Sequence, residues 1–124
     1  MPFASGAGAK IYYETHGHGT PIVMSAGMGG SGSFWSPQVQ ALADSHLVVL
    51  YDHVGTGRSE SGGRTIAGMA DDIAAVMDDA GLDAAHIVGH AIGGIVGLEL
   101  AVRHAERLRS LVVVNGWGRA DPFL

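Results

Sequence analysis

Cysteine is absent from the 124-residue chain, and lysine occurs once, as Lys10. Without cysteine the chain can form neither a disulfide nor a thiolate nucleophile, a composition typical of a reducing compartment. Charged residues make up only 15% of the sequence, and the formal net charge is −5. Because domains that bind nucleic acid are usually basic, we expect no nucleic-acid partner.

Long apolar runs are also missing. The longest, residues 87–100, is interrupted by His90 and Glu99 and is too short to span a bilayer. The first residues lack the charged-then-apolar pattern of a signal peptide. These absences lead us to expect a soluble, cytoplasmic protein with no membrane partner.

Apolar residues, in contrast, make up 47% of the chain. Its length suffices for one domain and not for two. Small domains bury a smaller share of their surface than large ones, so we expect part of the apolar surface to face something outside the chain. A second copy in a homo-oligomer and a complementary C-terminal half are the two candidate partners.

The apolar pattern alternates between strands and helices along the chain. Uninterrupted apolar runs and β-favouring residues predict strands at residues 10–16, 22–25, 47–51, 86–89 and 111–115. Helical spacing and capping signals predict a helix that begins at Ser36-Pro37 and two more at 66–80 and 92–107. Thr65 should cap the second helix and Gly81 should end it. This alternation predicts an α/β fold, with a mostly parallel sheet and helices on both faces.

Several polar residues suggest a metal site but fit one poorly. Four aspartates, Asp71, Asp72, Asp78 and Asp79, lie away from the apolar stripe of the second helix, and we expect them to form a solvated face. The arginines between 103 and 109 fit a solvated helix end. His86 and His90 would lie about 13 Å apart on a strand. We therefore expect no bound metal.

The glycine-rich segment Gly27-Met28-Gly29-Gly30-Ser31-Gly32 fits the pattern G-x-G-x-x-G, and Asp52 follows 20 residues later. That spacing is typical of a dinucleotide-binding fingerprint, in which the acidic residue binds the ribose. In the fingerprint the helix opens on the glycines, so that its N-terminus meets the pyrophosphate. Here the helix signal comes only at Ser36-Pro37. We therefore expect no nicotinamide or flavin cofactor, with dinucleotide binding as the alternative.

A second glycine motif, Gly89-His90-Ala91-Ile92-Gly93-Gly94, stands between a predicted strand and a predicted helix. With serine in place of Ala91 it would be G-x-S-x-G, the nucleophile elbow. Small residues suit this turn because the chain reverses sharply and pushes the central residue into a strained conformation. The N–H of Ile92 is then free to bind an oxyanion, and the loop at Gly27 would supply a second donor, the N–H of Met28.

His90 has two interpretations. It precedes the elbow residue and would line a pocket, or it would pack behind the turn as an ordinary half-exposed histidine. The sequence leaves both open.

Three stretches together resemble the α/β-hydrolase family: residues 25–31, the loop Asp52-x-x-Gly55-x-Gly57-x-Ser59 and the elbow at 89–94. The resemblance implies the α/β-hydrolase fold. Because the family's domain is about twice as long, it also implies that residues 1–124 form the N-terminal part of a single domain. Within the family, the sequence resembles a branch of aminoacrylate or carbamate hydrolases of the Rut pathway of pyrimidine degradation. That branch also carries G-H-A at the elbow.

The resemblance limits the chemistry. Ala91 has no atom that could attack a carbonyl, and the last histidine, His104, lies on the helix that leads away from the elbow. We therefore expect this chain alone to be inactive. An intact homologue would hydrolyse a labile small-molecule substrate, an enamine acid or a carbamate, with water activated directly by the family histidine. The alternatives are a non-catalytic relative that binds a ligand or a partner, and a serine esterase engineered from Ser to Ala.

Overall fold

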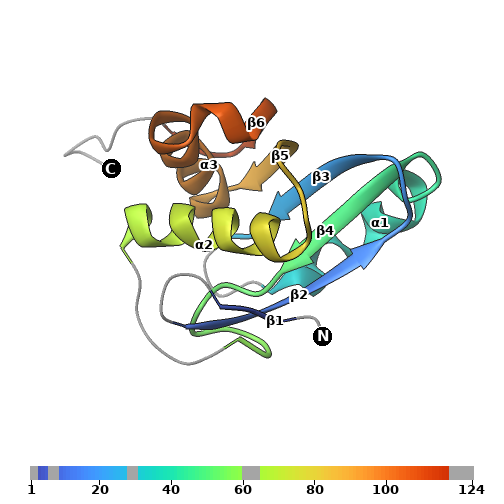
Figure 1. Cartoon of the computed structure of the whole chain (residues 1–124), viewed down its shortest axis with the longest axis horizontal. Coiled ribbons are helices and arrows are strands. Elements are labelled where there is room, and N and C mark those ends of the chain that lie inside the picture. Colours follow the sequence, from blue (N-terminus) through green and yellow to red (C-terminus); the bar gives the residue numbers. More distant parts are fainter. Residues whose placement is uncertain (1–2, 6–8, 28–30, 60–64, 118–124) are drawn as a thin grey trace.

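The computed structural model describes residues 3–5, 9–27, 31–59 and 65–117. Within these residues one sheet has the strand order β1-β2-β4-β3-β5-β6 (Figure 1). Its strands are β1 (Phe3–Ser5), β2 (Lys10–His16), β3 (Thr20–Ser25), β4 (His46–Tyr51), β5 (Ala85–His90) and β6 (Leu108–Val114). The last four in spatial order are parallel, and β1 and β2 are antiparallel to their neighbours.

Helices cover both faces of this sheet. They are α1 (Ser36–Leu42), α2 (Ile66–Asp79) and α3 (Ile92–Arg103), with short 3₁₀ turns η1 (Gly32–Trp35) and η2 (Ala105–Arg107). Alternate residues of one strand face opposite sides: Val23 packs with α2 and α3, whereas Ile22 and Met24 pack with Trp35 and α1. In Figure 1, α2 and α3 accordingly lie together, apart from α1. The predicted α/β fold class is confirmed.

Helix α2 follows the sequence prediction at both ends. Thr65 is its N-cap, with an Oγ1 that accepts a hydrogen bond from the N–H of Gly68 at 3.0 Å. Gly81 follows its end with φ of 75°, a conformation that favours glycine. Both signals are local in the sequence, which is why pattern reasoning found them.

Asp72 corrects the prediction of a fully solvated aspartate face. Its side chain is buried, 3% exposed, whereas Asp78 and Asp79 are exposed. The negative charge of Asp72 acts on Tyr51 and His53, which lie at the end of β4. A position off the apolar stripe predicts exposure to solvent, but Asp72 lies near polar groups that sequence periodicity does not reveal.

The predicted start of α1 at Ser36-Pro37 is confirmed, although Ser36 is already helical (φ −48°, ψ −41°) and Trp35, in the turn η1, takes the cap position. Two other predicted boundaries were wrong. The helix predicted to reach residue 107 ends at Arg103, because His104 leaves the helical conformation (φ −140°, ψ 55°). The next strand therefore begins at Leu108 and not at residue 111.

Strand β6 forms one edge of the sheet and pairs only with β5 among the described residues. Its apolar side chains are open: Val112 is 51% exposed, Val113 36% and Val114 40%. An apolar strand with a free edge is a template for pairing with further chain. The expectation of an external partner stays a prediction. None of the described helices has the length and apolarity that a membrane span needs.

Candidate active site

The turn between β5 and α3 has the geometry of a strained elbow. Ala91 lies at the N-cap of α3 with φ of 54° and ψ of −119°. A non-glycine residue in such a region costs on the order of 1–3 kcal/mol and is held there by its surroundings. The N–H of Ala91 donates to the carbonyl of Val114 at 2.9 Å, so the edge strand β6 helps to hold the turn.

Glycines let three backbone segments meet at this elbow. A Cβ on Gly89 would collide with the carbonyl of Gly93, and a Cβ on Gly93 would collide with the carbonyl of Ser25. The end of β5, the first turn of α3 and the end of β3 are therefore in direct backbone contact. No other residue type provides that space, which explains the glycine spacing seen in the sequence.

The first turn of α3 offers an unused donor. The N–H groups of Gly94 and Ile95 both donate to the carbonyl of Ala91, at 2.9 and 3.3 Å, and no side chain caps the helix. Within the described part of the chain, the N–H of Ile92 has no acceptor. A free N–H at a helix N-terminus favours a negative charge, so its placement suits the predicted oxyanion role. Met28, the second predicted donor, lies outside the described residues.

The loop after β3 approaches the elbow at Gly27. A Cβ on Gly27 would lie 3.4 Å from the Cβ of Ala91 and 3.3 Å from Nδ1 of His90. The His90 ring stacks on Phe34, with centroids 5.0 Å apart and an interplanar angle of 27°. Its Nδ1 is buried and has no hydrogen-bond partner among the described residues. His90 is thus packed between Phe34 and Gly27, beside the elbow.

Asp52 serves the backbone of its own loop. Its Oδ1 accepts from the N–H of Gly32 at 2.7 Å, and its Oδ2 accepts from the N–H of Arg58 at 2.9 Å. Gly57, with φ of 51°, passes so close that a Cβ there would meet the carboxylate. Both carboxylate oxygens are therefore engaged, which argues against ribose binding by Asp52.

Two further side chains, which the sequence reasoning missed, brace the end of β3. The hydroxyls of Ser25 and Tyr51 are 2.6 Å apart, and Nε2 of His53 lies 2.7 Å from the carbonyl oxygen of Ala26. Burial raises the pKa of the Tyr51 phenol and lowers the pKa of the His53 imidazole. Both groups are therefore neutral near pH 7. The signal that could have found His53 was its place in the loop motif, directly after Asp52.

His104 lies at the far end of α3 from the elbow. A helix of 12 residues is about 18 Å long, and Nε2 of His104 is bound to Oδ1 of Asp71 at 3.0 Å. It does not reach Ala91. Among the residues that the structure describes, there is also no group of three side chains suited to a metal ion.

This combination of parallel sheet, strained elbow and glycine-loop approach is that of an α/β hydrolase. The model of the family described as "alpha/beta hydrolase fold" matches residues 20–124. The chain belongs to the α/β-hydrolase family.

The chain spans about half the length of the curated relatives it matches. A protein of Azorhizobium caulinodans called "Putative carbamate hydrolase RutD" is 60% identical over 126 residues, which cover 100% of this chain and 48% of the relative. A protein of the same name from Caulobacter sp. strain K31 is 52% identical, with 97% of this chain and 47% of the relative covered. Among solved structures, an enol-lactonase from Burkholderia xenovorans LB400 is 33% identical with a TM-score of 0.90, over 95% of this chain and 48% of the enol-lactonase.

Proposed function

We propose that residues 1–124 form the N-terminal part of one α/β-hydrolase domain, and that the whole domain hydrolyses aminoacrylate or a carbamate in pyrimidine degradation. The observation that carries the proposal is Ala91: the elbow keeps its strained backbone (φ 54°) although it has no nucleophile to present. The names of relatives up to 60% identical point to a carbamate substrate.

The elbow would act on the substrate through its backbone. The unpaired N–H of Ile92, at the start of α3, would bind the oxygen on which negative charge develops, and the N–H of Met28 would be the second donor. Because the methyl group of Ala91 cannot form an acyl-enzyme, water would attack the substrate directly. His90 would line the pocket beside that water. A serine protease without its triad keeps a rate enhancement on the order of 10³–10⁴, which comes from substrate binding and oxyanion stabilisation. An enhancement of that size would suffice for a labile substrate.

The proposal can be tested with a joined protein, made of residues 1–124 of this chain followed by the second half of the Azorhizobium caulinodans relative. Ammonium release from carbamate is measured against the spontaneous rate. We expect the joined protein to accelerate it in proportion to its concentration. The isolated chain should not accelerate it, and should not hydrolyse p-nitrophenyl acetate beyond an albumin control.

An Ala91→Ser variant of the joined protein separates the alternatives. If the natural site works without a nucleophile, the alanine form already turns over carbamate. A joined protein that is inert with alanine but becomes an efficient p-nitrophenyl esterase with serine would instead mark a disabled serine esterase. Inactivity of both forms, with a ligand still bound, would favour a non-catalytic binding protein.

The dinucleotide alternative has its own direct test. Titration calorimetry of the chain with NAD and NADP should give no saturable heat, because the carboxylate of Asp52 is engaged by backbone N–H groups. Saturable binding tighter than about 100 μM, or about −5.5 kcal/mol, would contradict our assignment of both glycine motifs.

We further propose that the open edge of β6 pairs with the complementary half of the domain or, in its absence, with a second copy of the chain. The exposed side chains of Val112, Val113 and Val114 support this, because burying them would remove apolar surface from water. Light scattering coupled to size-exclusion chromatography should show the isolated chain as an oligomer. A cooperatively melting monomer at micromolar concentration would overturn the idea.

A further inference from the structure

The carbonyl of Ala26 is the first one in the chain beyond the paired part of β3. The ladder with β4 ends at the pair Met24 and Leu50, and the ladder with β5 ends at the pair Ser25 and Gly89. Ala26 is nevertheless only 1% exposed, so its carbonyl oxygen needs a hydrogen-bond donor within the protein. A side chain provides that partner in place of a strand.

That side chain is His53. Its Nε2 lies 2.7 Å from the oxygen of Ala26, and because a carbonyl oxygen only accepts, Nε2 carries the proton. The ring is 5% exposed and stands edge-on to Tyr51, with centroids 5.2 Å apart. Burial lowers the pKa of His53, although the hydrogen bond to Ala26 and the charges of Asp72 and Asp52 oppose this effect. The neutral ring therefore has one N–H, and Ala26 receives it.

The same short segment is also in contact with the elbow. A Cβ on Gly93, in the first turn of α3, would lie 2.8 Å from the oxygen of Ala26, and a Cβ on Gly27 would lie 3.4 Å from the Cβ of Ala91. The peptide that joins Ala26 to Gly27 is thus in contact with both His53 and the elbow. Its orientation fixes the direction in which the chain enters the loop that follows.

We propose that His53 is a positioning residue for hydrolysis: by donating to Ala26 it holds Ala26 and Gly27, the start of the glycine loop, against the elbow. The kinetic part of this inference rests on the proposed function; the structural part does not. A displacement of about 1 Å at a reacting centre can cost about a hundredfold in rate. A hydrogen bond that fixes one peptide plane beside the site is therefore worth more to catalysis than to stability.

Two substitutions of His53, with side chains of nearly equal length, distinguish a positioning role from a packing role. Gln at position 53 can place an N–H near that of Nε2, whereas Met fills similar space without a donor. A His46→Leu variant serves as the control, since His46 lies at the other end of β4 and its Nδ1 is 3.0 Å from the hydroxyl of its neighbour Ser45. We expect His53→Gln to behave like the natural protein and His53→Met to differ from both.

The first measurement uses the chain itself. Hydrogen exchange of the amides in residues 22–27 should be about tenfold faster in His53→Met than in His53→Gln. The second uses the joined protein: His53→Met should lower kcat between about 10- and 100-fold with a smaller change in KM, and His53→Gln should restore it. If the Met variant does not fold, His53→Asn takes its place, because its amide is too short to reach Ala26.

Equal exchange and equal kcat in the Gln and Met variants would overturn the proposal and reduce His53 to a packing residue. A joined protein without any turnover would instead count against the proposed function. In that case the exchange difference still decides whether His53 positions the loop.

Discussion

Helix α2 has Thr65 as its N-cap, and the side chain of Thr65 accepts a hydrogen bond from the N–H of Gly68 at 3.0 Å. Helix α3 has Ala91 as its N-cap, which has a strained backbone (φ 54°) and makes no side-chain cap. The two helices pack against each other over the same face of the sheet. Their first turns are therefore two solutions to one problem, the unpaired N–H groups of a helix start.

The difference between the two helix starts shows that the elbow lowers the stability of the fold. A side-chain cap such as that of α2 is worth about 1 kcal/mol, whereas the strain at Ala91 costs on the order of 1–3 kcal/mol. The strained start leaves the N–H of Ile92 open and brings the turn against Gly27. A site for an oxyanion needs both features. The two starts thus respond to mutation in opposite ways.

The largest effect on stability should come from adding a side chain at Gly93, where α3 contacts the backbone of β3. In Gly93→Ala the new methyl group would run into the carbonyl of Ser25, which belongs to backbone and cannot turn aside. We expect a loss of about 3 kcal/mol or more, or failure to fold. Urea denaturation followed by circular dichroism measures it.

Gly81→Ala at the end of α2 is the matched control. Its φ is 75°, and a Cβ there meets no atom within 4 Å. Only the backbone conformation is penalised, by about 1–2 kcal/mol. Equal losses in the two variants would show that the elbow has no special crowding.

Ala91→Gly should have the opposite sign. Glycine relieves the strain at this φ and ψ. Its greater conformational freedom in the unfolded chain reduces the gain in stability by about 0.5–1 kcal/mol. We expect a net gain of up to about 2.5 kcal/mol in the free energy of unfolding. A loss of stability on this substitution would mean that the methyl group packs usefully and that the elbow is not strained in solution.

The elbow and α2 could be predicted from the sequence because their signals are short-range. Gly89 and Gly93 lie two residues to either side of Ala91. Thr65 and Gly81 each lie within two residues of the end of α2 that they mark. The contacts that brace the site could not be predicted in this way. His53 meets Ala26 across 27 positions, so its role depends on which strands become neighbours.

Buried charge was the other failure of sequence reasoning. Asp71 and Asp72 are adjacent in the chain, yet the first binds Arg103 at the surface and the second is buried near Tyr51 and His53. Periodicity places a residue on a helix face. It does not show whether that face meets water or the polar ends of strands.

Removing the cap of α2 should have a moderate effect. Thr65→Ala deletes the acceptor of the Gly68 N–H, and we expect a loss of about 1 kcal/mol. Thr65→Ser keeps the hydroxyl and is the control. Thermal melting of the three proteins should rank the natural chain and Thr65→Ser together, above Thr65→Ala. If all three melt alike, the first turn of α2 is held by packing and the contrast with α3 is weaker than its geometry indicates.

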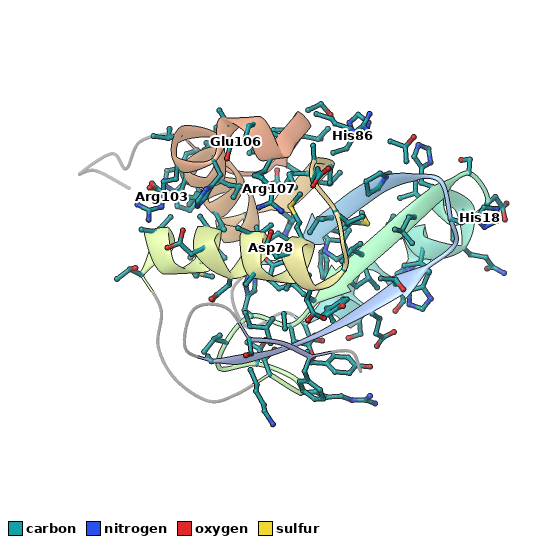
Figure 2. All side chains as sticks on the ribbon, viewed as in Figure 1. His18, Asp78, His86, Arg103, Glu106 and Arg107 are labelled. Carbon is teal, nitrogen blue, oxygen red and sulfur yellow. The ribbon has the colours of Figure 1, made fainter. Side chains whose placement is uncertain are left out.

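The smallest effect concerns the tie between the two helices. Asp71 of α2 accepts from Nε2 of His104 at 3.0 Å and pairs with Arg103 at 3.2 Å, at the end of α3. Arg107 makes a similar tie to Asp78 at 2.8 Å, and Figure 2 shows these two side chains pointing toward one another.

The hydrogen bond from His104, followed by the hydrogen bond and charge of Arg103, holds the pKa of Asp71 below its ordinary value of 3.8. The unfolded chain therefore takes up a proton at higher pH than the folded one. The stabilisation is complete above that ordinary pKa and is lost as pH falls through the lower, folded value. Because the pair is more than a third exposed, Asp71→Asn should cost no more than about 0.5 kcal/mol at pH 7. The difference should shrink in 1 M salt and disappear at strongly acid pH. A cost for Asp71→Asn that is independent of salt and pH would show that Asp71 acts through packing and not through its charge.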